Sequence, residues 1–116
     1  MGKPVAGDIV VVRFPFSDLR QSKRRPALVL ATADFDNLIL CQITSKPYSS
    51  KRVLELSTDD FATGGLSIVS YARPDKLFTA DPEIIERTIG TLKLGIFRRV
   101  LIQVRRLFIE PRALAN

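Results

Sequence analysis

The chain has 116 residues, of which 46% are hydrophobic and 26% are charged, and this size and composition predict one folded domain with one core. Its net charge is +6, it contains no histidine, and Cys41 is its one cysteine. These counts exclude Ser-His-Asp and Cys-His catalysis, histidine-bearing zinc sites and clusters held by several cysteines. Any chemistry must therefore use carboxylates, hydroxyls and guanidinium groups.

The first half of the chain predicts short strands. Residues 8–16 are β-branched and then alternate, which indicates a strand, and the polar residues 17–24 predict a loop. The apolar run 26–31 is too short for a helix and is bounded by turn residues. Residues 38–44 predict a further strand, in which Cys41 is expected to be a small buried hydrophobic residue.

The next part of the chain continues this pattern. Residues 53–56 predict a short strand, and the glycines at 64–65 break the chain. Residues 66–71 predict another strand that ends near Pro74, which has no N–H donor and is expected at a sheet edge or a strand end. Residues 84–91 predict a brief turn and one more strand.

The C-terminal part changes its period. Apolar residues recur there at steps of three or four, as in an amphipathic helix: Leu94, Phe97, Val100, Leu101, Val104, Leu107 and Phe108. Pro111 is expected to end this helix, and residues 108–116 to form a tail. Short strands and one terminal helix predict a mostly-β fold, either a small barrel or a compact sheet capped by the helix, as a single domain over residues 1–116. The sequence shows neither a membrane-spanning run nor a secretory signal, so we expect a cytoplasmic protein with no membrane partner.

Two places on the predicted strands carry groups that suit a phosphate. Arg25 closes the basic segment Lys23-Arg24-Arg25, where a planar guanidinium could form two parallel hydrogen bonds to a phosphate; the alternative is a solvated loop charge. Thr44, followed by Ser45 and Lys46, ends the strand 38–44, where a hydroxyl could donate to the same group; the alternative is an ordinary turn.

Two further clusters are weighed in the same way. Arg73 and Asp75 are two residues apart in extended backbone and therefore share a face, as a base–electrophile pair or as a surface ion pair. Arginines on the polar face of the terminal helix could bind an acidic partner, but such a run is usually solvated: Arg98, Arg99, Arg105 and Arg106. The acidic pairs at 34/36 and 59/60 are interpreted as turn formers rather than as a metal site.

Several segments together resemble the PemK/MazF family of toxin ribonucleases. Residues 7–16 (GDIVVVRFPF) and 23–30 (KRRPALVL) resemble the opening of the family, and residues 43–45 (ITS) its second motif. Residues 65–77, which contain SYARPDKL, resemble the third motif, and residues 89–92 (IGTL) precede the terminal helix as they do in the family. The match runs from about residue 7 to residue 107.

The resemblance implies an SH3-like barrel with a C-terminal helix, a homodimer, an endoribonuclease that cuts single-stranded RNA, with messenger RNA as the expected substrate, and a cognate antitoxin. It gives Arg25 and Thr44 the positions of catalytic residues, and matches Arg73 and Asp75 to a pair with acid and base roles in only some members. We expect RNA to be held by Arg13, Phe16, Arg20, Lys23, Arg24, Ser45 and Lys46.

The implied reaction needs no metal and no cofactor. The RNA 2′-OH attacks the neighbouring phosphate and leaves a 2′,3′-cyclic phosphate and a 5′-OH. In this scheme Arg25 stabilises the charge that grows on the phosphoryl oxygens, Thr44 donates to the same group and Asp75 is the base. Arg73 is a poor proton donor because a guanidinium stays charged, so we assign it the role of an electrostatic clamp.

Two features limit what can be transferred. The loop 17–23 is short and basic, so the sequence preference of relatives does not carry over, and the helix has arginines where acidic residues are more usual. The competing hypothesis is a non-catalytic SH3-like module that binds nucleic acid or protein. Such a binder would present aromatic stacking platforms. The candidates here are Tyr48, Tyr71 and Phe78, whereas Phe14, Phe16 and Phe97 are expected in the core.

Overall fold

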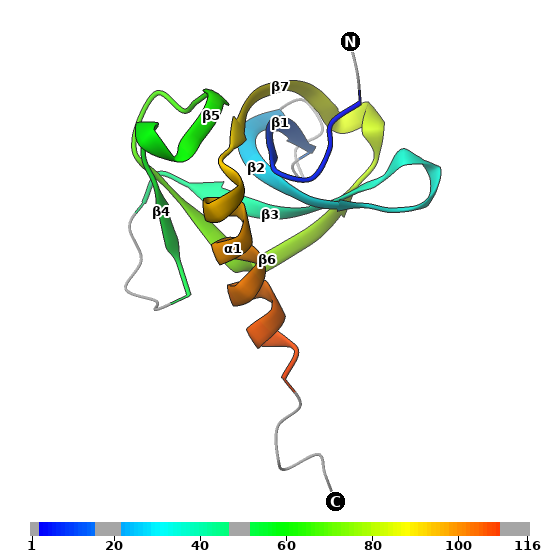
Figure 1. Ribbon diagram of the computed structural model, residues 1–116. Coiled ribbons are helices and arrows are strands. Elements are labelled where there is room, and N and C mark those ends of the chain that lie inside the picture. The colour runs from blue at the N-terminus through cyan, green and yellow to red at the C-terminus, as the bar shows by residue number, and fades with distance from the viewer. Residues whose placement is uncertain (1–2, 16–21, 47–51, 110–116) are drawn as a thin grey trace, which may run out of the picture.

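In the described part of the chain, seven antiparallel strands form one curled sheet, and a single α-helix follows them (Figure 1). The computed structural model describes residues 3–15, 22–46 and 52–109. The elements are β1 (Asp8–Pro15), β2 (Ser22–Thr32), β3 (Leu38–Thr44), β4 (Leu54–Leu56), β5 (Phe61–Gly64), β6 (Ser70–Ala80), β7 (Ile85–Leu92) and α1 (Leu94–Leu107). The strand order is β4-β6-β3-β2-β1-β7-β5. This curled half-barrel with a C-terminal helix confirms the predicted fold class.

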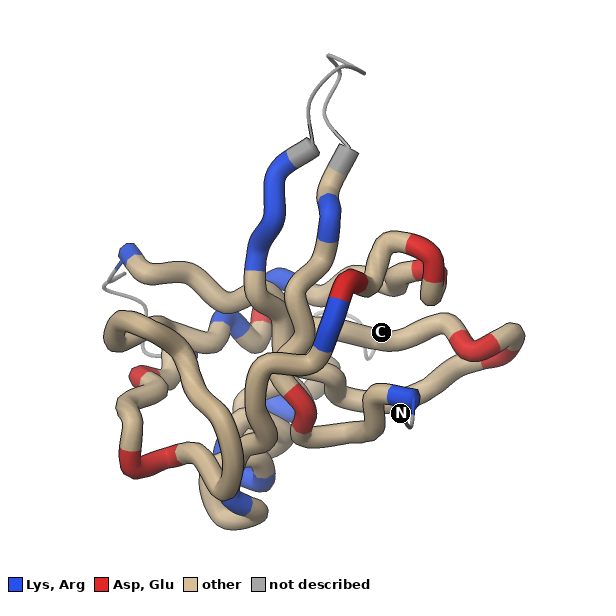
Figure 2. Tube along the Cα trace, turned by 90° about the horizontal axis from the view of Figure 1, so that it is seen from above, with Lys and Arg blue, Asp and Glu red and all other residues tan. Residues whose placement is uncertain are grey.

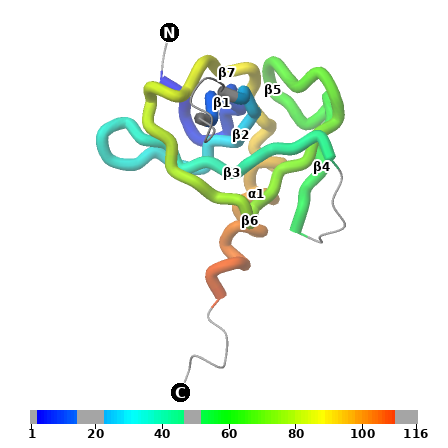
Figure 3. Tube along the Cα trace, turned by 180° about the vertical axis from the view of Figure 1, so that it is seen from behind, coloured from blue at the N-terminus to red at the C-terminus, as the bar shows by residue number. Residues whose placement is uncertain are grey.

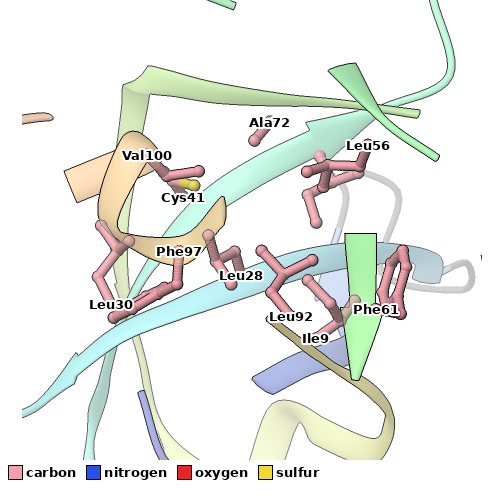
Figure 4. Packing of buried hydrophobic residues seen from close by; sticks show 11 residues of the cluster. Ile9, Leu28, Leu30, Cys41, Leu56, Phe61, Ala72, Leu92, Phe97 and Val100 are labelled. Atoms are coloured by element: carbon pink, nitrogen blue, oxygen red, sulfur yellow. The ribbon is translucent and has the colours of Figure 1, made fainter. Parts of the chain in front are cut away.

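The core lies on both faces of the central strands because consecutive residues of β2 and β3 alternate between them. The first core cluster, drawn in Figure 4, consists of Ile9, Leu28, Leu30, Cys41, Ile43, Leu56, Phe61, Ala72, Leu92, Phe97 and Val100. The second core cluster lies on the other face and consists of Val10, Val12, Ala27, Val29, Leu38, Leu40 and Ala80. Cys41 is fully buried, as predicted, and burial raises the pKa of its thiol to about 12. The thiol is therefore neutral at pH 7 and unsuited to act as a nucleophile.

α1 covers the face of the sheet that carries the first core cluster. Its buried residues are Phe97 and Val100, three apart on one side of the helix, and they pack with Cys41 and Ala72. Both views of the trace show α1 crossing the sheet and its C-terminal end extending past the strands (Figures 1 and 3). The predicted amphipathic helix is confirmed, and it ends at Leu107.

The structure corrects the predicted start of the second strand and adds a strand. β2 begins at Ser22, so residues 22–25, predicted as loop or loop edge, are strand. The reason is pairing with a neighbouring strand: β1 pairs with β2 as far as Pro15 and Ser22. Backbone hydrogen bonds between the strands hold a polar segment that composition alone indicates as a loop. β5 was not predicted, because it is four residues long and ends at Gly64 in a region taken as a chain break.

The predicted strand 66–71 is wrong in both of its ends. β6 runs from Ser70 to Ala80, lies between β4 and β3, and carries Pro74 buried in its interior. Proline is tolerated there because the β3–β6 register shifts between Cys41 and Gln42, which leaves residues 74–76 without partners in β3. β4 pairs with β6 only as far as Ala72, so Pro74 removes no donor from that ladder either.

Candidate active site

The strand register brings Arg25 and Thr44 together. β2 pairs antiparallel with β3, with Ala27 opposite Gln42. Continued by two residues, this register places Arg25 opposite Thr44, on the same face as Gln42. β2 and β3 run in opposite directions, so the first residues of β2 lie beside the last residues of β3 at one edge of the sheet.

A cavity of about 350 Å³ opens at this edge, and we call it the arginine cavity. It is lined by guanidinium groups and hydroxyls above an apolar floor. The polar lining residues are Arg24, Arg25, Arg87, Thr44, Ser45, Ser67 and Ser70, and the apolar ones are Val11, Pro26, Ile43, Leu66, Ile68 and Ile89. Three cations and four hydroxyl groups around one hollow suit an anion with several oxygen atoms, such as a phosphate.

The segment between β5 and β6 closes one side of this cavity. Gly64 has a φ of +62°, and a Cβ there would collide with the carbonyl oxygen of Ile89, so the turn requires glycine. Beyond the turn, the Ser70 hydroxyl donates to the carbonyl oxygen of Ile68 at 3.1 Å and fixes the segment. The glycines interpreted as a chain break thus shape a wall of the site.

Arg25 is the cavity arginine whose charge is left for a ligand. Glu86 accepts a hydrogen bond from Nε of Arg24 and lies 3.3 Å from Arg87, so one carboxylate serves both outer arginines. Among the described residues, no carboxylate lies within ion-pair distance of Arg25. Arg25 is half-buried, and within the described part of the chain it is the arginine of this cavity that no carboxylate neutralises, so its charge is available to an anion.

Thr44 is held with its hydroxyl proton available. The residue is 9% exposed, and its Oγ1 accepts a hydrogen bond from the backbone N–H of Lys46 at 3.2 Å. A hydroxyl that accepts one bond still has its own proton to donate. Because the Lys46 N–H fixes the oxygen, Thr44 can present that proton to a ligand in the cavity without first reorganising.

A second cavity, of about 450 Å³, adjoins the first at Arg25, and we call it the aromatic cavity. Its lining is Phe14, Arg25, Gln42, Asp75, Lys76, Leu77 and Phe78. Arg73 and Asp75 form an ion pair at 3.4 Å, as expected from their shared face, with side chains 17% and 37% exposed. Asp75 lines this cavity, and Arg73 lines neither cavity. Of the predicted catalytic residues, Arg25 and Thr44 thus share the arginine cavity, and Arg25 and Asp75 share the aromatic cavity.

The other predicted RNA-binding residues gather around the same edge. Arg13 of β1 lies opposite Arg24 of β2, and Lys23 precedes Arg24. Arg13 and Lys23 are both exposed. Figure 2 shows this basic charge along both strands of the hairpin. Ser45 and Lys46 are exposed directly after β3. Phe16, Arg20 and Tyr48 lie outside the described residues.

Two other parts of the molecule suit RNA less well. The arginines of α1 are exposed at positions 98, 99, 105 and 106, but α1 covers the face opposite to Thr44 and Arg73. A third cavity of about 560 Å³ mixes Lys3 and Arg87 with the carboxylates of Asp8, Asp36 and Glu86. Lys3 forms an ion pair with Asp36, so its charge is already neutralised, and the lining does not favour a polyanion.

Three site residues were missed by the sequence analysis. Arg87 reaches the arginine cavity only because β7 pairs with β1, and Glu86, the preceding residue, contacts Arg24 and Arg87 there. Gln42 carried a signal: it is an amide in the apolar strand 38–44, two residues before Thr44, so alternation alone puts both on one face. Phe14, assigned to the core, does contact the second core cluster and also lines the aromatic cavity.

Residues 6–108 match the family model of PemK-like, MazF-like toxins of type II toxin–antitoxin systems. The chain belongs to this family. The match spans every element from β1 to α1 and includes both cavities. No curated protein sequence gives a significant match. Among the described residues, no helix is long and apolar enough to cross a membrane, and no group of three or more His, Cys, Asp or Glu residues could hold a metal ion.

Solved structures share the PemK/MazF-like fold. The MazE–MazF complex of Deinococcus radiodurans (form III) has 22% sequence identity and a TM-score of 0.74, and the alignment covers 91% of this chain and 96% of that chain. An endoribonuclease in complex with its cognate antitoxin from a mycobacterial species has 11% identity and a TM-score of 0.69, with 93% and 99% covered. MazF-mt6 of Mycobacterium tuberculosis has 19% identity and a TM-score of 0.64, with 85% and 95% covered. At these identities the likeness establishes the fold.

Proposed function

We propose that this family member is the toxin of a toxin–antitoxin pair and a metal-independent, sequence-specific endoribonuclease that cuts single-stranded RNA, with messenger RNA as its substrate, in the cytoplasm. The observation that carries the proposal is the placement of Arg25 and Thr44 on facing strands in one cavity, where no described carboxylate neutralises Arg25. A structure matched by this chain is an endoribonuclease, which supports the same activity.

The scissile phosphate is placed in the arginine cavity. The 2′-OH attacks phosphorus, the bond to the 5′-oxygen breaks, this oxygen takes up a proton from water, and the products are a 2′,3′-cyclic phosphate and a 5′-OH. Charge grows on the non-bridging oxygens, where Arg25 offers a two-pronged donor and Thr44 offers its hydroxyl proton. The Lys46 N–H fixes the Thr44 oxygen before the substrate arrives, so donation from this hydroxyl requires little reorganisation.

The proton of the 2′-OH goes to Asp75 in this mechanism. Asp75 lines the aromatic cavity, which shares Arg25 with the arginine cavity, so a ribose at the junction would face both the carboxylate and the bound phosphate. Arg73 is a positioning residue: its ion pair with Asp75 at 3.4 Å orients the carboxylate. Arg13, Lys23, Arg24, Ser45 and Lys46 extend the cationic and polar surface along the RNA, and Phe16 and Arg20 are proposed to complete it.

The partners proposed are a cognate antitoxin and a second copy of the chain. Two of the matched structures are complexes with an antitoxin, MazE in one case. An acidic segment of such a partner would compete with RNA for the arginine cavity, since three arginines line it. A homodimer would give a chain of this size additional buried area.

The test is cleavage of a mixed-sequence single-stranded RNA in EDTA, with the Arg25→Ala protein as control and with both product ends mapped. Cyclic-phosphate and 5′-OH ends that depend on Arg25 are the expected result. RNA that is bound and stays intact over varied sequences would contradict the proposal and favour the non-catalytic binding module. Cleavage that stops in EDTA and returns with a divalent cation would contradict the metal-free mechanism.

A further inference from the structure

The aromatic cavity has the chemistry of a nucleobase site. Phe14 and Phe78 form one of its walls with ring centroids 5.1 Å apart and planes tilted by 57°, and Leu77 adds apolar surface. Polar groups stand elsewhere in the lining: the Gln42 amide and the Asp75 carboxylate. A base in single-stranded RNA has two apolar faces and a polar edge, so it needs this combination of apolar wall and polar groups.

Gln42 is the residue in this cavity that is placed to read the base. Its side chain is half-buried and, among the described residues, makes no hydrogen bond. Ala27 and Arg73 lie opposite it on the neighbouring strands, so its backbone is fixed from both sides. An amide carries donors and an acceptor together and can pair with the edge of a base at two points. An unused amide at a fixed backbone position therefore suits selection between bases.

The proposed reaction decides which nucleotide enters. Asp75, the proposed proton acceptor, lines the aromatic cavity. Arg25 and Thr44, the proposed hydrogen-bond donors to the phosphate, meet in the arginine cavity. The nucleotide that carries the attacking 2′-OH must therefore sit on the aromatic side of Arg25. This step rests on the proposed function.

We propose that the aromatic cavity binds the base of the nucleotide on the 5′ side of the cleaved bond, against Phe14 and Phe78, and that Gln42 determines which base is accepted. Gln42 then acts on specificity and leaves the phosphate chemistry to Arg25 and Thr44. The preference for one base on the 5′ side of the cleaved bond is thus assigned to a residue of this chain, Gln42.

The experiment uses chimeric oligonucleotides with one ribonucleotide in a deoxyribonucleotide strand. The flanking sequence is taken from a wild-type cleavage map, and the base of the ribonucleotide is A, C, G or U. The wild type is expected to differ by about tenfold to a hundredfold in kcat/KM between its best and worst base, the discrimination of one two-point contact. The Gln42→Leu protein should cut all four within about threefold. The Gln103→Leu protein, with the same change on α1, should retain the wild-type ratios.

A second readout separates this inference from the proposed function. Binding is measured by fluorescence anisotropy with the same four sequences as all-deoxy strands, which cannot be cut. Base discrimination in the wild type that is lost in Gln42→Leu supports the site even if no RNA is cleaved, in which case the ribonuclease proposal alone fails. Cleavage with the same base ratios in wild type and Gln42→Leu overturns the inference while leaving the ribonuclease proposal intact. Equal binding of all four strands by a wild type that does not cleave also overturns it.

The aromatic wall gives an independent check. Replacing Phe78 by leucine keeps apolar volume but removes the ring, and it should weaken binding of the deoxy strand by roughly tenfold. Phe108→Leu is the matched control, because Phe108 is exposed after α1. Equal affinity of the two variants would contradict stacking in the cavity. A thermal melt of the Phe78→Leu protein confirms that the comparison concerns folded molecules.

Discussion

The two faces of the β2–β3 pair have opposite tasks. On one face Leu28, Cys41 and Ile43 are almost fully buried in the first core cluster under α1. On the other face the second core cluster fills the middle of the pair, and Arg25, Gln42 and Thr44 line cavities nearer the strand ends. Ile43 lines the arginine cavity from the core side. Because strand residues alternate, Gln42 lies between the core residues Cys41 and Ile43, and Thr44 follows Ile43. The core face fixes the backbone, and the backbone fixes the site.

This comparison predicts that substitutions on the two faces separate rate from stability. A substitution on the cavity face should lower cleavage and leave unfolding nearly unchanged. A substitution on the core face should lower stability, and where the side chain lines no cavity, as with Leu28 and Cys41, it should leave the cleavage rate of each folded molecule nearly unchanged.

The largest expected effect on rate is at Asp75. Asp75→Asn keeps the shape of the side chain but removes the proposed base, which contributes about 10²–10⁴ in rate. The cleavage rate under saturating RNA should fall by that factor. An Asp75→Asn enzyme with the wild-type rate would remove the base from the mechanism. Asp81→Asn is the matched control, because Asp81 is exposed beyond β6 and lines neither cavity.

The largest expected effect on stability is at Ile43, next to Thr44. The side chain is 1% exposed, so Ile43→Ala should cost about 2–5 kcal/mol of unfolding free energy, measured by urea denaturation. Thr44→Val should cost about 1 kcal/mol, because it removes only the acceptor of the Lys46 N–H. If the two adjacent substitutions destabilise the protein equally, the division between the faces is wrong.

The smallest effect concerns the pH dependence of stability. Burial raises the pKa of the Cys41 thiol from 9.0 to about 12. The unfolded chain therefore loses this proton first, and the contribution of the neutral thiol, complete below about pH 9, is lost as the pH rises toward 12. The free energy of unfolding should fall more steeply over this interval in the wild type than in Cys41→Ala. Equal slopes would show that the thiol titrates as freely in the folded protein as in the unfolded chain.

The sequence predicted the elements whose patterns are strong and local. β1, β3, β7 and α1 follow from β-branched runs or from a helical stripe. β6 did not, because Pro74 in a strand interior requires a bulge that only the pairing with β3 provides. Arg25 and Thr44 came from a resemblance of motifs, and their meeting depends on the register of β2 and β3. Arg87 comes from a strand far along the chain, so no local pattern connects it to the site.

The central claim is that Arg25 and Thr44 act on the same phosphate, and a double-mutant cycle on the cleavage rate tests it most directly. Arg25→Ala and Thr44→Val are each expected to slow cleavage by about 10²–10³. Because both donors serve one group, the double variant should be slower than the worse single variant by less than about tenfold. A loss in the double variant equal to the product of the two single losses would contradict the claim, as would a Thr44→Val enzyme with the wild-type rate.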